Sequence, residues 1–355
     1  NGSLELAGGP DFGLITTTGV TFTGDATSTV GNSTTDFPDG GTIQVESGAE
    51  LEIENVDAGN AHSISLNESN GNGEVEGGFV GDGTIRFAGA GAFEVTDGGG
   101  SSDDAAAILP SIVADQEVTF DGSSSDRFVT GSITANGLVD FKATGSDGTS
   151  PIDGEDIDGN LVDGSVSVPS GGEISSGTDK LIVDSGNFST DGGNAIIGGD
   201  LEVGLNLTVE GSGAFNPSGN VNVGQNLTVG SEPNLSVANA TLISNTDGVD
   251  ATIDLGQEVT VGEFKTGDKL AAAVTITGSP LTVDGDVTIN NPGPNPETSL
   301  ILEEDLIVNG TFDLETDEQS GNTTNAVGGT GAIVFASGRS PLIAVVNAPS
   351  PPESV

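Results

Sequence analysis

The sequence predicts an elongated all-β solenoid, in which short parallel strands stack turn upon turn along one axis. Apolar residues recur in apolar-x-apolar pairs, which is the pattern of short strands with one buried face. These pairs return about every 20 residues, and such a period is typical of solenoids. Gly, Asn, Asp, Ser and Thr interrupt every window in which an amphipathic helix could form.

The repeat consists of pairs that begin at thirteen positions, separated by 19 to 22 residues except for one step of 33. No single turn can bury its apolar face, so stacked turns would bury it jointly, with polar residues outward. At about 4.8 Å per turn, thirteen turns would form a rod of roughly 60 Å. The positions are Ile43, Ile64, Ile85, Val118, Val139, Leu161, Leu181, Leu201, Val221, Leu242, Val261, Leu281 and Leu300.

The first part of the chain divides around this repeat. Residues 1–40 are predicted to form an N-terminal strand segment or cap, because they are strand-like but precede the period. The solenoid is predicted over residues 41–315, with an acidic loop at 147–164. A Gly-, Ser- and Asp-rich insertion at 97–110 accounts for the long step, and residues 103–109 within it could form one or two helical turns.

The last part of the chain is apolar and then rich in proline. Residues 316–348 are predicted to form a C-terminal cap or a strand that pairs with the next subunit, because they include some of the least charged segments in the chain. Residues 349–355 have the composition of a Pro-rich tail.

Two residue types recur at equivalent positions of the repeat and predict its corners. Gly204 and Gly224 suit tight corners in which φ is positive. Asn206 and Asn226 are predicted to stack as an asparagine ladder inside a corner, where a buried amide could not carry a glycan.

The segment 194–314 carries a resemblance to a known group of proteins. Its repeats Gly199–Val209 and Asn220–Val229 resemble those of secreted right-handed parallel β-helix surface proteins, such as adhesin passenger domains, and the likeness spans about residues 40–315. The resemblance implies a three-sided coil whose outer faces and loops carry the function. An array of β-sandwiches is the rival fold, which the regular step disfavours.

Charge places the chain outside an ordinary cytoplasm. Asp and Glu number 54 against 7 Lys and Arg, for a net charge of −47. This charge opposes binding to nucleic acid or to an anionic membrane. The chain has no Cys, hence no disulfides or thiolate chemistry, and no apolar run long enough to span a membrane. The composition predicts an extracellular or cell-surface protein, either of a halophile or of a calcium-rich environment.

The sequence holds no motif for catalysis. His62 is the single histidine and is expected to be a surface turn residue. No nucleophile elbow and no phosphate-binding loop occurs, so the chain is predicted not to be an enzyme. A hydrolase that uses paired carboxylates stays open as an alternative, since acidic pairs are abundant.

Calcium is the best candidate ligand. The acidic loop packs carboxylates and one amide closely enough to supply the six to eight oxygens that Ca²⁺ takes, although their spacing does not match an EF-hand. A solvated loop without metal is the alternative. The candidate ligands are Asp153, Glu155, Asp156, Asp158, Asn160 and Asp163.

Asn-x-Ser/Thr sequons predict N-glycosylation of a secreted chain. The candidates, once the two ladder residues are set aside, are Asn32, Asn67, Asn187, Asn234, Asn239, Asn309 and Asn322.

Together these features predict a non-enzymatic structural protein of a cell surface or extracellular matrix. The apolar terminal strands would pair between copies and assemble the chain end to end into a filament or layer. The alternatives are an adhesin whose loops bind a glycan or another surface receptor and, less strongly indicated, a carbohydrate-active β-helix enzyme.

Overall fold

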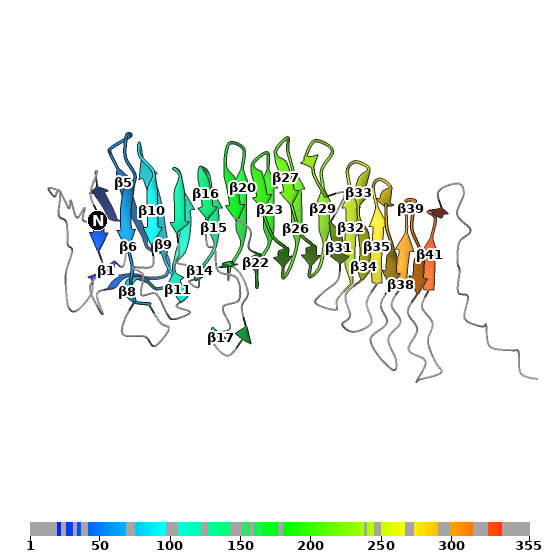
Figure 1. Ribbon diagram of the computed structural model, residues 1–355, viewed down its shortest axis with the longest axis horizontal. Coiled ribbons are helices and arrows are strands. Elements are labelled where there is room, and N and C mark those ends of the chain that lie inside the picture. The colour runs from blue at the N-terminus through cyan, green and yellow to red at the C-terminus, as the bar shows by residue number, and fades with distance from the viewer. Residues whose placement is uncertain are drawn as a thin grey trace, which may run out of the picture.

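The computed structural model describes residues 20–22, 26–30, 34–36, 42–68, 75–96, 106–121, 127–142, 151–152, 155–156, 160–162, 164–176, 180–237, 240–244, 250–266, 273–289, 299–314 and 326–335. These residues form strands and turns and no helix. The strands stack along one axis into an elongated rod (Figure 1). The predicted all-β solenoid with parallel sheets is therefore confirmed.

One sheet of 13 strands, here called the long sheet, follows the rod over the whole described length. It comprises β2 (Ala26–Val30), β5 (Glu50–Asn55), β9 (Thr84–Gly89), β12 (Ser111–Ala114), β15 (Ile133–Ala135), β20 (Val166–Pro169), β23 (Phe188–Asp191), β26 (Leu207–Glu210), β29 (Leu227–Val229), β32 (Ala251–Leu255), β35 (Ala273–Thr277), β38 (Ser299–Leu302) and β41 (Ala326–Gly329).

A second series of strands forms a nine-stranded sheet and then, further along the rod, a four-stranded one. The nine-stranded sheet comprises β3 (Thr34–Asp36), β6 (His62–Ser65), β10 (Phe93–Thr96), β13 (Val118–Asp121), β16 (Leu138–Phe141), β21 (Glu173–Ser176), β24 (Asn194–Ile197), β27 (Ala214–Pro217) and β30 (Asn234–Leu235). The four-stranded sheet comprises β33 (Val259–Val261), β36 (Leu281–Val283), β39 (Leu306–Val308) and β42 (Ile333–Phe335).

The third series begins with a four-stranded sheet and continues as a ten-stranded one. The first comprises β1 (Val20–Phe22), β4 (Thr42–Val45), β8 (Val75–Val80) and β7 (Asn67–Glu68), of which β7 runs antiparallel. The ten-stranded sheet comprises β11 (Ala106–Leu109), β14 (Arg127–Thr130), β19 (Asn160–Val162), β22 (Leu181–Val183), β25 (Leu201–Val203), β28 (Val221–Val223), β31 (Thr241–Ser244), β34 (Glu263–Thr266), β37 (Val287–Ile289) and β40 (Phe312–Leu314).

The spacing of the turns differs from the predicted period. It is about 23 residues rather than about 20, and along the long sheet it varies from 19 between Phe188 and Leu207 to 34 between Leu51 and Ile85. The connections between strands differ in length, so the turns contain different numbers of residues.

The predicted repeat positions stack in register only in part. Leu181, Leu201, Val221 and Leu242 lie directly over one another, as predicted. Ile43, Ile64 and Ile85, however, lie in strands of three different sheets. Each turn contributes three strands with similar apolar alternation, so a period read from single residues can step from one face to the next.

Segments expected to lie outside the solenoid contribute turns to it. Within residues 1–40, strands β1, β2 and β3 pair in parallel with β4, β5 and β6. Within 316–348, strands β41 and β42 continue two sheets. The expected helical turns at 103–109 are wrong where the structure describes them, because 106–109 form β11 and pair with β14. The end of the expected insertion is thus part of the wall.

Side chains on the inner faces alternate with outward polar ones and form one core along the rod. The strand β26 shows the pattern, with Leu207 and Val209 buried and Thr208 between them partly exposed. Phenylalanines are the largest side chains in this core, and Phe120 stacks on Phe141 with ring centroids 5.0 Å apart. Each large buried side chain contributes about 1.5–3 kcal/mol, and only because the neighbouring turns cover it.

Candidate functional site

The corner that leads into the long sheet carries a ladder of side-chain oxygens. The Oγ of Ser111 accepts a hydrogen bond from the backbone N–H of Ser132 at 3.1 Å, and the Oγ of Ser132 accepts one from the N–H of Ser165 at 3.0 Å. The Oγ of Ser165 in turn accepts the N–H of Asn187 at 3.1 Å. One side chain per turn thus satisfies the next turn's backbone donor.

The same ladder continues through the predicted asparagines. The Nδ2 of Asn206 donates to Oδ1 of Asn187 at 2.8 Å, and the Nδ2 of Asn226 donates to Oδ1 of Asn206 at 2.8 Å. The Oδ1 of Asn226 then accepts the backbone N–H of Thr252 at 2.8 Å. The asparagine ladder predicted at Asn206 and Asn226 is confirmed, and Asn187 is its first amide. The expectation that the two amides are buried inside the corner is wrong, because both are partly exposed.

This geometry accounts for three of the sequons. Two residues after each ladder asparagine comes a hydroxyl, at Ser189, Thr208 and Thr228, and these three lie in direct register on the outer face of the long sheet. A strand repeats its direction every two residues, so both groups of each sequon point outward. These three sequons are therefore explained by the structure, since each combines a ladder amide at the corner with an outward hydroxyl two residues later.

The remaining glycosylation candidates lie apart from one another. Asn234 is exposed in β30. The Nδ2 of Asn309 donates to Oδ1 of Asp284 at 2.7 Å. Asn67 lies in β7. The other candidates, Asn32, Asn239 and Asn322, lie outside the described residues.

The candidate calcium loop is described only in short pieces. Glu155 and Asp156 form β18, which pairs antiparallel with β17 (Pro151–Ile152), and Asn160 begins β19 in the wall. Asp153, Asp158 and Asp163 lie outside the described residues. Within the part of the chain that the structure describes, no three His, Cys, Asp or Glu side chains are placed to hold a metal ion together.

His62 is a core residue, and the expectation of a surface turn residue is wrong. Its exposed fraction is 1%, and its ring meets the edge of Phe93 at a centroid distance of 6.3 Å. It is the first residue of β6, in which His62 and Ile64 are buried and Ser63 between them is partly exposed. The alternation of His62, Ser63 and Ile64 could have indicated that His62 points inward. Histidine is a polar residue, however, and its residue type alone does not indicate burial.

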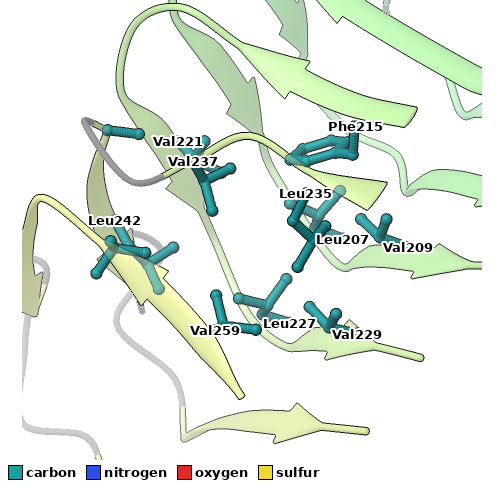
Figure 2. Close-up of a pocket in the computed structure, with 12 residues that line it drawn as sticks. Leu207, Val209, Phe215, Val221, Leu227, Val229, Leu235, Val237, Leu242 and Val259 are labelled. Atoms are coloured by element: carbon teal, nitrogen blue, oxygen red, sulfur yellow. The ribbon is translucent and has the colours of Figure 1, made fainter. Parts of the chain in front are cut away.

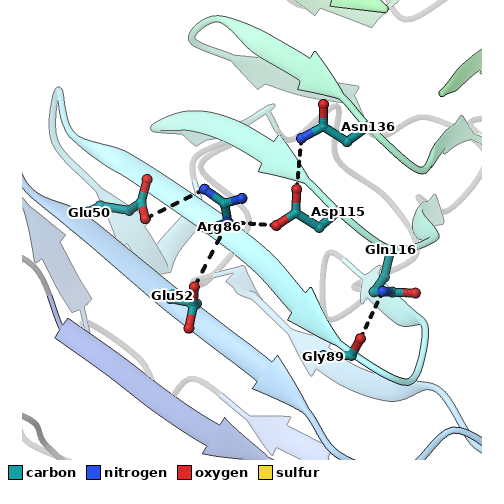
Figure 3. Close-up of polar contacts among 7 residues, drawn as sticks. All are labelled: Glu50, Glu52, Arg86, Gly89, Asp115, Gln116 and Asn136. Carbon is teal, nitrogen blue, oxygen red and sulfur yellow. Dashed lines mark hydrogen bonds and ion pairs between the residues drawn. The ribbon is translucent and has the colours of Figure 1, made fainter. Parts of the chain in front are cut away.

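The outer face of the long sheet near its N-terminal end carries a group of ion pairs around Arg86 (Figure 3). The Nε of Arg86 lies 2.6 Å from Oδ2 of Asp115 and 3.8 Å from a carboxylate oxygen of Glu52, and its Nη1 lies 4.0 Å from Glu50. The hydrogen bond to Asp115 raises the pKa of Arg86 above its ordinary value. One cation thereby bridges three neighbouring turns.

Replacing Arg86 with glutamine is expected to lower stability by about 1 kcal/mol at low salt, because three carboxylates then face one another without a cation. The difference from the parent should shrink as NaCl screens their repulsion. Melting temperature against salt measures it. Lys265→Gln is the control, since it also removes one positive charge but breaks only the single pair with Glu263. Parallel salt curves for the two variants would contradict the bridging role.

A small apolar cavity lies where the second series of strands is interrupted (Figure 2). The nine-stranded sheet ends at β30, and the four-stranded one begins with β33. Between them a cavity of about 30 Å³ is lined by apolar side chains, among them Leu235, Val237 and Val259. A cavity without polar groups stays dry, so we interpret it as a packing gap rather than a reaction site.

Filling this gap is expected to stabilise the rod. Val237→Ile adds one methylene at the lining and should raise the free energy of unfolding by up to about 0.8 kcal/mol. Val203→Ile adds the same group at a tightly packed inner position that does not line the gap, and it should lower stability. Urea unfolding of both variants measures the difference, and a loss in Val237→Ile equal to that in Val203→Ile would show that the gap cannot accept the group.

The described residues contain no helix long and apolar enough to cross a membrane. Comparisons with family models, with curated proteins and with solved structures give no match for this chain. The features brought together by the fold are a continuous sheet and a ladder of side-chain hydrogen bonds at its corner, in a chain rich in carboxylates.

Proposed function

We propose that this chain is a non-enzymatic structural rod of a cell surface or extracellular matrix, which assembles end to end into a filament or layer. The observation that carries the proposal is the long sheet, whose 13 strands follow one another in unbroken order from β2 to β41. Backbone hydrogen bonds at every turn run along the rod axis, and the corner ladder adds side-chain bonds in the same direction. Such a rod resists bending and holds two points apart.

The two ends of the described sheets support assembly between copies. The outermost strands are β1, β2 and β3 at one end, and β40, β41 and β42 at the other. The outer edge of a strand offers backbone donors and acceptors to another strand. Pairing the last turn of one copy with the first turn of the next uses two different surfaces and does not close, so it generates a filament.

The acidic coat supports an environment rich in salt. With a net charge of −47, carboxylates on neighbouring turns repel one another at low ionic strength. The melting temperature of the purified chain is therefore expected to rise steeply with NaCl, measured by circular dichroism. A melting temperature that does not change with salt would contradict this role of the coat.

Electron microscopy of the full chain in molar NaCl tests the proposed assembly. The expected result is thin filaments or layers with an axial repeat near the rod length, roughly 60 Å for 13 stacked strands. Isolated rods at every salt and protein concentration would show that the chain does not assemble by itself.

A further inference from the structure

The middle of the long sheet carries an outward surface without charge, here called the neutral strip. It consists of two columns of side chains on β12, β15, β20, β23, β26 and β29 and on the corner before each strand. The strip comprises Ser111, Val113, Ser132, Thr134, Ser165, Ser167, Asn187, Ser189, Asn206, Thr208, Asn226 and Thr228. All twelve are partly or fully exposed.

The absence of charge is local. The same columns carry Glu52 and Arg86 on the turns before the strip and Asp254 on the turn after it. The outer faces of the nine-stranded and ten-stranded sheets carry charges over the same turns, including Asp140 in the first and Glu202 in the second. In a chain of 54 acidic residues, this face therefore differs from its surroundings.

No long loop borders the strip along these turns. On the side of the ten-stranded sheet, one to four residues connect each strand to the long sheet over these turns, and on the other side two to four residues do so. The β17–β18 hairpin leaves the rod between β16 and β19, at the corner away from the long sheet (Figure 1). A long, straight partner can therefore lie along the strip.

We propose that the neutral strip is the lateral contact between two copies of this chain, an inference that rests on the proposed function and extends it from filaments to bundles. Two rods of charge −47 repel, and they approach at least cost where neither presents a carboxylate. Both strips repeat every turn, about 4.8 Å, so hydroxyls and amides of one rod meet those of the other in matched steps. Asp115, Asp191 and Glu210 border the strip, so the contact forms when salt screens them.

The size of the strip sets the strength of the contact. Six short strands present less than the roughly 800 Å² per partner of a standard interface, so a single pair of rods binds weakly. Rods stacked in a filament place many strips in line, and these contacts act together. Bundles are therefore expected only where many aligned copies are held close together.

Agglutination of beads that carry the full chain at high density tests the strip without requiring filaments. In molar NaCl, parent beads are expected to clump, and beads with Thr208→Glu/Thr228→Glu should clump less, because the added charges oppose one another across the lateral contact and leave the end-to-end contact unchanged. The control is Ser175→Glu/Asn216→Glu, which places the same charges in one outward column of the nine-stranded sheet. The control beads should clump like the parent.

The outcomes separate the two proposals. Parent beads that do not clump, or strip-variant beads that clump as the control does, overturn the lateral contact. Single filaments in the micrographs without bead clumping would overturn the strip and leave the proposed function standing. Bead clumping without filaments would overturn the end-to-end assembly and leave the lateral contact standing.

Discussion

Gly224→Ala is expected to lower the free energy of unfolding by about 3 kcal/mol. A Cβ at position 224 would overlap the carbonyl oxygen of Gly204 on the preceding turn, and a Cβ at 204 would overlap the carbonyl oxygen of Asp184. The N–H of Gly224 donates to the oxygen of Val203 at 2.7 Å, so the corner cannot move away without opening the stack.

Gly230→Ala is the matched control at the next corner of the same turn. There the nearest atom to an added Cβ is the Cα of Glu210 at 3.4 Å, an ordinary contact, and the effect should stay within about 0.5 kcal/mol. Urea unfolding in molar NaCl measures both variants. Equal midpoints would show that the corner at Gly224 yields.

Gly204 and Gly224 are required at their corners for a reason other than the predicted one. Gly204 and Gly224 were expected at corners with positive φ, but neither has a positive φ, unlike Gly171 or Gly192. Their requirement for glycine comes from the close approach of one turn's backbone to the next. A repeat in the sequence shows that the position is constrained, and only the stacked structure shows which constraint applies.

Asn206→Ala is expected to lower the free energy of unfolding by about 2 kcal/mol, because it removes three hydrogen bonds of the ladder. One is the donation from Nδ2 to Asn187, and the other two are donations to Oδ1 from the N–H and the Nδ2 of Asn226, at 3.2 and 2.8 Å. The position is partly exposed, and water replaces some of these bonds, so the effect stays below that of three buried ones.

Asn216→Ala makes the same chemical change at an exposed outward position of β27 and should be nearly neutral. Asn206→Ser should recover part of the loss, because Ser165 fills the same column and accepts the next backbone N–H through its Oγ. Thermal unfolding of the three variants measures the series. If Asn206→Ala and Asn216→Ala melt at the same temperature, the ladder does not stabilise the stack.

Prediction from the sequence succeeded where one residue's surroundings repeat and failed where they change. The ladder was predictable because Asn206 and Asn226 sit in two turns with equal steps between strands. His62 was missed because inward positions elsewhere are mostly apolar, and nothing in its own type signals burial. The candidate site depended on more than pattern, since the neutral strip joins residues from six turns separated by unequal numbers of residues.

The sequence by itself determined that this chain winds into stacked turns of short strands, because alternating apolar residues and frequent corner residues allow burial only between neighbouring turns. It also determined the acidic coat. Only the tertiary structure decided which strands share a face, because corner length sets the register and the three faces of each turn have the same alternation. It likewise decided that Arg86 meets three carboxylates and that an uncharged surface runs along the long sheet, since both depend on which turns lie side by side.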